Sequence, residues 1–170
     1  MEKNITIIGG GLAGSEAAYQ IAKRGIKVKL YEMKPSKFSP AHSNCNLAEI
    51  VCSNSFKSNL ITNASGLLKE ELRQLDSLLI KIADEVQVPA GQALAVDREK
   101  FAEEVTKRLE QFANIEVIRQ EVGKEISVKQ LAENGIVIIA TGPLTSESLS
   151  KEIQEFTGED KLYFYDAAAP

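Results

Sequence analysis

The chain is poor in the residues that metal sites and disulfide-bonded domains require. Its 170 residues include two cysteines, one histidine and no tryptophan. Two cysteines are too few for the disulfide framework of a small secreted domain. The spacing of Cys45 and Cys52 also matches none of the usual zinc patterns, which need further ligands. We therefore expect no disulfide framework and no metal site.

Long apolar runs and an excess of basic charge are also absent. No segment has the length needed to cross a membrane, and the first residues lack the apolar stretch of a secretory signal. We therefore expect a cytoplasmic protein without membrane contact. Lysine and arginine number 20 against 24 acidic residues, which gives a net charge of −4. This balance argues against a broad nucleic-acid-binding face, so any RNA contact is expected to be local or to lie elsewhere.

What the sequence does contain is a dinucleotide-binding pattern at residues 5–32. A short apolar strand at 5–8 runs into a glycine turn, followed by a helix and a second strand. The first glycine of this pattern allows a tight turn, the second lets the backbone approach a pyrophosphate, and the third lets the helix pack close to the strand. We expect the helix N-terminus to receive the phosphates. The predicted cofactor-binding residues here are Gly9, Gly10, Gly11, Leu12, Ala13 and Gly14.

Glu32 ends the second strand and is predicted to accept hydrogen bonds from the adenosine ribose. A carboxylate at this position would repel a 2′-phosphate and therefore disfavours NADP at this site. The small Ala18 on the helix and Gly25 at its end complete the strand–helix–strand unit. The alternative is a glycine-rich turn that binds nothing, and the intact unit argues against it.

Residues 33–96 are expected to form a long loop and a helical insert. The first part is polar, carries His42 and both cysteines, and lacks strong periodicity, which is typical of functional loops. Apolar residues then recur at spacings of three and four and predict one helical face that packs on the domain. Residues 86–96 are expected to be extended or a hairpin. The helical face comprises Leu68, Leu72, Leu75, Leu79 and Ile82.

The remaining pattern predicts an α/β domain with a parallel sheet of strand order 3-2-1-4. A helix over 98–112 precedes a strand at 115–122, and the apolar run 136–140 is expected to be a buried parallel strand. The turn at 141–143 would end that strand at the sheet edge where ligands bind. Folds of this kind usually continue past the fourth strand. We therefore expect residues 1–170 to be a partial cofactor domain of a larger enzyme, with 163–170 leading into further structure.

Several sequence blocks resemble known flavoproteins. The segment GGGLAGSEAA at 9–18, with Glu32 and IIATG at 138–142, is similar to the Rossmann-like FAD-binding domain of glutathione-reductase-type enzymes. More specific blocks resemble the TrmFO family of folate-dependent tRNA uracil-5-methyltransferases along essentially the whole chain. These blocks are AEIVCSNSFKS (48–58), GLLKEELRQLDSL (66–78), VPAGQALAVDREKF (88–101), VIIATGPLTS (137–146) and FTGEDKLYFYDAAAP (156–170).

This resemblance implies an enzyme that methylates C5 of a uridine in the tRNA T-loop. Methylenetetrahydrofolate would supply the one-carbon unit, FAD would deliver the electrons, and NADH or NADPH would reduce the flavin. Most contacts to tRNA, folate and nicotinamide would then lie beyond residue 170.

Cys52 is the candidate catalytic nucleophile. A thiolate that adds to C6 of uracil makes C5 nucleophilic, and the polar neighbours Ser53 and Asn54 can bind the substrate or the flavin. The alternatives are a buried structural thiol for Cys52 and a capping role for its two neighbours. His42 is either a general acid or base or a surface residue. Cys45 is expected to be structural.

Further cofactor contacts are expected outside the glycine turn. In flavoproteins of this type an arginine at the position of Arg98 commonly lies near the cofactor, and the alternative is a solvated charge at a helix start. Val122 would lie against the adenine. Ala140, Thr141 and Gly142 would close the pyrophosphate or ribose side, because only a small turn allows that approach.

Two other functions stay open. A GidA-type flavoprotein of wobble-uridine modification would share the glycine block, but such proteins commonly carry a histidine where this chain has Leu12, and they lack the VCSNS block. A non-catalytic dinucleotide-binding redox module is the second. The VCSNS and VPAGQALAVDR blocks are difficult to explain by dinucleotide binding alone and argue against it.

Overall fold

A four-stranded parallel sheet forms the centre of the molecule, in a computed structural model that describes residues 4–158. The strand order is β6-β2-β1-β7, and each neighbouring pair is parallel. Counted along the chain without the insert, this is the predicted order 3-2-1-4, which is therefore confirmed. The strands are β1 (Ile5–Ile8), β2 (Val28–Tyr31), β6 (Ile115–Ile118) and β7 (Ile136–Ile139).

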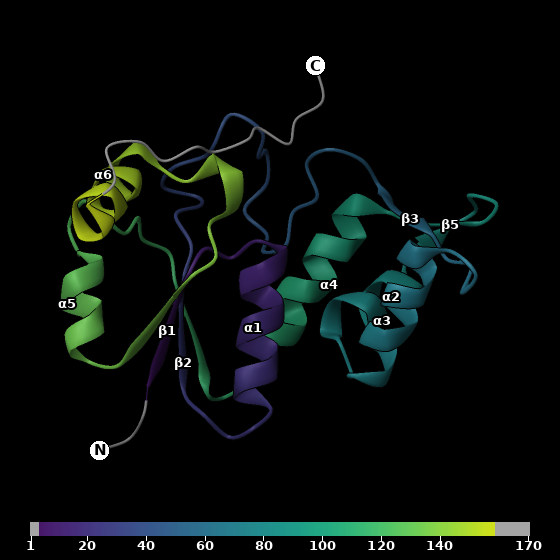
Figure 1. The fold of residues 1–170 in the computed structure, drawn as a ribbon, viewed down its shortest axis with the longest axis horizontal. Helices are drawn as coiled ribbons and strands as arrows, with labels where there is room; N and C mark the ends of the chain where they lie inside the picture. The colour runs from purple at the N-terminus through teal and green to yellow at the C-terminus, as the bar shows by residue number, and fades with distance from the viewer. Residues whose placement is uncertain (1–3, 159–170) are drawn as a thin grey trace.

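Helices cover both faces of this sheet (Figure 1). Successive residues of a strand point to opposite faces, so Ile7 packs into one apolar cluster and Ile8 into another. The larger cluster includes Phe101 of α4, and the smaller one includes Leu149 of α6. The helices of the first face are α1 (Leu12–Ala22) and α4 (Arg98–Glu110), and those of the second are α5 (Val128–Glu133) and α6 (Glu147–Thr157).

The insert between β2 and α4 forms a second, antiparallel sheet with its own helices, at the right of Figure 1. Its strand order is β3-β5-β4, and of the two forms expected for residues 86–96, extended or a hairpin, the chain adopts the hairpin. Leu94 and Val96 are buried in the larger cluster, which makes the insert continuous with the main core. Its elements are β3 (Ser55–Ser58), α2 (Ala64–Gln74), α3 (Leu78–Glu85), β4 (Gln87–Val88) and β5 (Ala93–Val96).

The expectation of one apolar helical face over 68–82 is wrong. The chain breaks between α2 and α3 at Asp76, whose φ of 60° is left-handed. Leu68 and Leu75 are 55% and 69% exposed, whereas Ile82 is buried. A new helix starts at Leu78, where Ser77 caps it locally and Glu16 of α1 accepts hydrogen bonds from the N–H groups of Leu78 and Leu79. Capping at this point begins a second helix where periodicity alone would continue the first.

The expected burial of the strand at 136–140 is also wrong. β7 is parallel to β1 as predicted, but Ile136 and Ile139 are 59% and 43% exposed. Among the described residues β7 pairs with β1 alone and forms an edge of the sheet. An uninterrupted apolar run is typical of a strand covered on both faces, but it does not report whether the strand is at an edge. Strand β6 ends at Ile118 and is therefore shorter than the strand expected at 115–122. Val122 instead forms an isolated bridge with Ile126.

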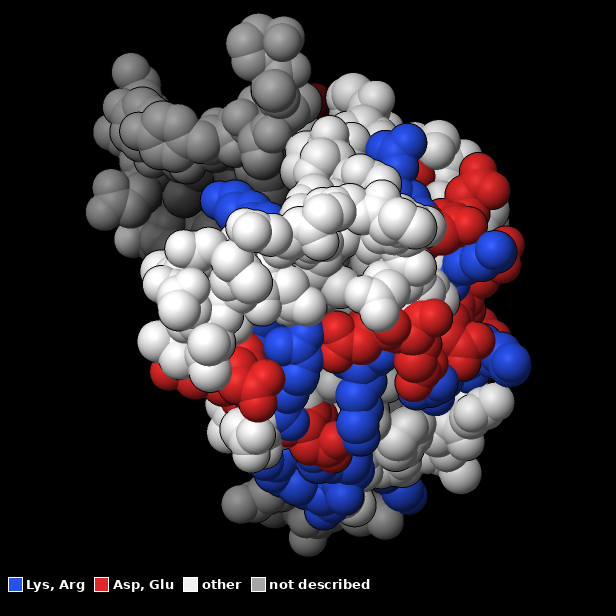
Figure 2. All heavy atoms as spheres, turned by 90° about the vertical axis from the view of Figure 1, so that its right-hand side faces the viewer, with Lys and Arg blue, Asp and Glu red and all other residues white. Residues whose placement is uncertain are grey.

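Charged side chains of both signs are intermixed on the side of the molecule formed by the insert, in a band below a largely uncharged surface (Figure 2). No helix within residues 4–158 combines the length and apolar character needed to span a bilayer. The expected lead-in at 163–170 and most of the block at 156–170 lie outside the described residues.

Leu30 in the central strand β2 provides a test of this core. It is fully buried, and we expect Leu30→Ala to lower the free energy of unfolding by about 3 kcal/mol, because a cavity adds to the lost apolar burial. Leu68→Ala is the matched control and should change it by less than about 0.5 kcal/mol. Urea unfolding followed by circular dichroism measures both, and equal losses would contradict the described packing.

Candidate functional site

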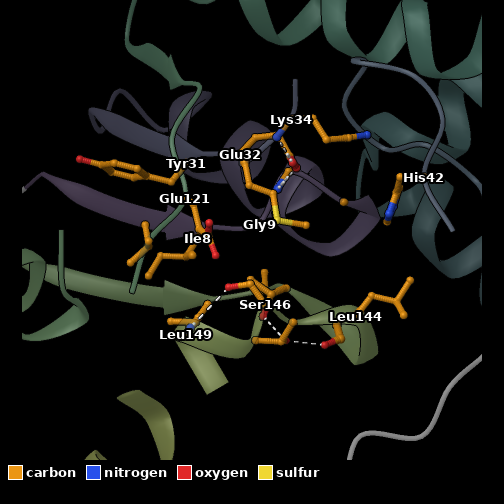
Figure 3. A pocket seen from close by; sticks show the side chains of 18 of the residues that line it. Ile8, Gly9, Tyr31, Glu32, Lys34, His42, Glu121, Leu144, Ser146 and Leu149 are labelled. Carbon is orange, nitrogen blue, oxygen red and sulfur yellow. Dashed lines mark hydrogen bonds between the residues drawn. The ribbon is translucent and has the colours of Figure 1, made fainter. Parts of the chain in front are cut away.

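A pocket of about 320 Å³ opens at the carboxyl ends of β1, β2 and β7. This is the edge of a parallel sheet where ligands bind in open α/β folds. In Figure 3, Gly9, Glu32 and Lys34 lie on one side of the pocket and Leu144, Ser146 and Leu149 on the opposite side. The lining includes most predicted cofactor residues, namely Gly9, Gly10, Gly11, Leu12, Ala13, Glu32, Val122, Ala140, Thr141 and Gly142.

Two glycines make the tight turn at the base of the pocket possible. Gly9 has a φ of +103°, and a Cβ there would lie 2.7 Å from the carbonyl oxygen of Ala140. A Cβ on Gly14 would lie 1.8 Å from the carbonyl oxygen of Gly9. Gly14 does not line the pocket but allows α1 to contact the turn directly. The turn therefore requires a hydrogen at both positions, because a side chain would collide with backbone.

The N-terminus of α1 faces the pocket, and no side chain of the helix's first turn caps it. Gly11 is the N-cap residue, no side chain caps the helix, and the first turn contains no acidic residue. A Cβ on Gly11 would meet nothing within 4 Å, so the space beside it is open. Unpaired N–H groups and the helix dipole favour a negatively charged group at such a site. The local geometry fits a pyrophosphate.

Glu32 is held in the pocket wall by two backbone donors. Its Oε2 accepts from Gly10 N–H and its Oε1 from Lys34 N–H, both at 3.0 Å, and the residue is 7% exposed. Each carboxylate oxygen can accept a second hydrogen bond. Glu32 can therefore accept from a ligand hydroxyl while its orientation stays fixed, and the ribose contact remains a prediction.

A buried ion pair in the pocket wall, between Lys34 and Glu49, was not predicted from the sequence. Lys34 Nζ lies 3.1 Å from Glu49 Oε2, with side chains only 4% and 8% exposed, and it also donates to Asn46 O. Burial tends to raise the pKa of Glu49, but hydrogen bonds from Ser43 and Lys34 outweigh it, so the pKa lies below its usual value. The pair ties the loop that follows β2 to the pocket. The only sequence signal for this ion pair is that Glu49 lies inside the family-specific block AEIVCSNSFKS at 48–58.

His42 lines the same pocket and is half-buried. Its Nδ1 lies 2.5 Å from Ser39 Oγ. Burial, and then the charge of Lys34, lower the pKa of His42 below its usual value, so the imidazole is neutral at pH 7. His42 was interpreted either as a general acid or base or as a surface residue. The structure places it in the pocket wall, and a role as an acid or base stays a prediction.

The remaining predicted residues lie outside this pocket. Val51 lines it, but the next residue, Cys52, is exposed and does not. Ser53, Asn54 and Arg98 line a second hollow between the start of β3 and the start of α4. The structure thus divides the predicted site residues between two hollows on either side of Cys52. Within residues 4–158, no group of three or more His, Cys, Asp or Glu side chains is placed to hold a metal ion.

The sheet order and the glycine turn at its carboxyl edge define a doubly wound α/β protein of the Rossmann type. The chain belongs to the glucose inhibited division protein A family (GIDA), which it matches over residues 4–170.

Similar proteins carry a more specific name. Proteins named methylenetetrahydrofolate–tRNA-(uracil-5-)-methyltransferase TrmFO from Lactobacillus johnsonii and Fusobacterium nucleatum are 59% and 61% identical to this chain over 170 residues. The chain spans 37% and 38% of their respective lengths. Among solved structures, the GidA-related protein from Thermus thermophilus is 17% identical with a TM-score of 0.37, covering 69% of this chain and 38% of that one.

The ion pair predicts a specific dependence of stability on pH. Because the pKa of Glu49 is depressed by folding, its pairing stabilises the protein above the ordinary carboxyl value of 4.5, and this contribution is lost as pH falls through the folded-state pKa. Glu49→Gln leaves the Lys34 ammonium buried without its counterion. We expect it to lower the free energy of unfolding at pH 7 by about 3 kcal/mol and to reduce the loss of stability in acid.

Urea unfolding between pH 3 and pH 7 measures both effects. Glu110→Gln, at an exposed position at the end of α4, is the control and should match the unsubstituted protein. Similar behaviour of the two variants would mean that the ion pair does not hold the loop.

Proposed function

We propose that the protein to which this chain belongs methylates C5 of a T-loop uridine in tRNA. Methylenetetrahydrofolate would be the one-carbon donor, FAD the cofactor, and NADH or NADPH the reductant, in the cytoplasm. Support comes from the 59–61% identity to proteins named TrmFO along the whole chain. The observation that carries the proposal is the exposed Cys52 thiol, one residue beyond the wall of a pocket that fits a dinucleotide.

An accessible thiol is what methylation of uracil at C5 needs. C5 is a poor nucleophile in the neutral ring, and addition of the Cys52 thiolate to C6 would turn it into an enolate carbon. The new C5–carbon bond then forms as one of the two carbon–nitrogen bonds of the folate methylene breaks. The C5 proton leaves, the second carbon–nitrogen bond breaks to release the folate, a hydride reduces the transferred carbon to a methyl group, and the C6–sulfur bond breaks to return the thiolate. Cys52 is regenerated, so it acts as a covalent catalyst.

The glycine pocket would hold FAD. The N-terminus of α1 at Gly11 would receive the pyrophosphate, Glu32 would accept from the ribose, and the turn at Thr141 and Gly142 would close the opposite side, with Val122 against the adenine. FAD, when bound, supplies the two electrons that reduce the transferred carbon. No 2′-phosphate is present on this cofactor, so the buried carboxylate of Glu32 is compatible with it.

Two other functions predict different products. A GidA-type flavoprotein would act on the wobble uridine, and the match to the GIDA family gives this possibility its weight. A redox-sensing module would bind nucleotide without turnover. Nucleoside mass spectrometry of bulk tRNA from a strain that lacks the gene separates them. Loss of 5-methyluridine alone supports the proposal. Loss of a wobble modification supports the GidA-type function. No change in 5-methyluridine or in wobble modification contradicts both tRNA-modifying functions.

The role of Cys52 is tested by Cys52→Ser in the full-length protein. We expect 5-methyluridine formation to fall by about 10⁴-fold or more, because a hydroxyl cannot replace the thiolate, while bound flavin is retained. Cys45→Ser is the matched control, since Cys45 is also an exposed free thiol in the same loop region. Methylation of tRNA in vitro and the visible flavin spectrum are the measurements. Retention of activity by the Cys52 variant would assign the nucleophile to another residue.

A further inference from the structure

The second hollow is lined by the two residues that follow Cys52 in the chain. It measures about 480 Å³ and shares no lining residue with the glycine pocket. Ser53 and Asn54, which follow the thiol, form one part of its wall, and Arg98 at the start of α4 forms another. The remaining lining residues are Val88, Val96 and Asp97.

Main-chain pairing fixes the distance between the thiol segment and Arg98. The N–H of Val96 donates to the carbonyl of Asn54 at 2.9 Å, and Ser55 is paired with Ala95 in the β3–β5 ladder. Cys52 is two residues before the paired Asn54, a separation of at most about 7 Å between the Cα atoms. Arg98 is two residues after the paired Val96. The backbones of Cys52 and Arg98 are therefore each two residues from the same hydrogen-bonded pair.

The hollow contains an arginine with no partner. Arg98 is exposed and makes no hydrogen bond or ion pair with any residue in 4–158, and the side-chain amide of Asn54 is equally unengaged. The neighbouring carboxylate of Asp97 is occupied, because its Oδ1 accepts from Lys100 N–H at 3.2 Å and its Oδ2 lies 3.4 Å from Lys100 Nζ. Glu99 is exposed on the same helix turn. Arg98 therefore offers a cation and several donors to a ligand.

We propose that this hollow binds a backbone phosphate of the RNA strand whose target base lies at Cys52, with Arg98 as the phosphate ligand. This proposal rests on the function proposed above. The planar guanidinium fork matches two phosphate oxygens, and the Asn54 amide adds a donor. A single-stranded loop exposes both its bases and its phosphates, so a base at the thiol would place an adjacent phosphate near Arg98.

The charge distribution of these 170 residues favours a local contact over a broad basic face. The net charge is −4, and acidic and basic side chains are intermixed on the side formed by the insert (Figure 2). A broad electrostatic attraction for RNA is therefore lacking on this face. One unpaired arginine beside the nucleophile would instead set the register of the strand, because phosphate contacts position a nucleic acid without reading its sequence.

The test uses Arg98→Gln in the full-length protein with a T-arm RNA hairpin as the probe. We expect affinity for the hairpin to fall about 10-fold. The slope of log affinity against log salt concentration should decrease by about 0.7, the value for one phosphate contact on a single strand. Flavin occupancy should be unchanged. Arg98→Lys should restore the salt slope but not the full affinity, because a lysine keeps the charge and loses the fork.

Lys107→Gln is the matched control, since it removes one positive charge from the exposed surface at the other end of α4. An equal loss of affinity in this variant would overturn the proposal in favour of general electrostatics. Loss of flavin from Arg98→Gln with unchanged RNA affinity would overturn it by assigning Arg98 to the cofactor. Unchanged RNA affinity in an enzyme that forms 5-methyluridine would reject the phosphate site and leave the function standing. Arg98-dependent binding without 5-methyluridine formation would reject the function instead.

Discussion

The close backbone packing around Gly9 is the constraint on which the pocket depends. The carbonyl of Gly9 occupies the position where a Gly14 side chain would begin, and a Cβ on Gly9 would collide with Ala140 and Thr141, which follow β7. Hydrogen bonds from Gly9 N to Tyr31 O and from Ala140 N to Ile8 O, both at 2.8 Å, hold this contact. Three chain segments thus meet at one point, and the N-terminus of α1 is aimed into the space between them.

A buried polar network connects that turn to the loop that carries the thiol. Gly10 donates its N–H to Glu32, and its carbonyl accepts from Ala48 N–H at 2.8 Å. The Lys34–Glu49 pair then fixes the loop from within. Removal of one partner of a buried ion pair leaves an uncompensated charge, so the loop has little freedom to move independently of the pocket. The position of Cys52 relative to the glycine pocket therefore depends on the glycine turn and not only on the loop sequence.

The insert gives the molecule a second chemical environment on the other side of the thiol. Its small antiparallel sheet pairs the segment after Cys52 with the strand that leads into α4. Leu94 and Val96 of that strand are buried in the main core, which anchors the strand to the rest of the domain. One face of the thiol loop borders the predicted cofactor pocket, and the other borders the hollow with Arg98. In the proposed function, this arrangement would bring a cofactor and a polymer to the same residue.

The sequence alone indicated the glycine turn and an extended or hairpin segment through local signals: an apolar strand, glycines at fixed spacing, and a break at Pro89 and Gly91. The strand order followed from the fold class that the strand–helix–strand pattern predicts. The sequence also indicated most of the pocket lining, since residues at the carboxyl ends of parallel strands must meet. It did not reveal the break at Asp76, the exposure of Ile139, the Lys34–Glu49 pair or the place of Arg98 beside Ser53. Only the tertiary structure decided these features, because helix capping by Glu16, edge position in a sheet, and burial of opposite charges all depend on contacts between residues far apart in the chain.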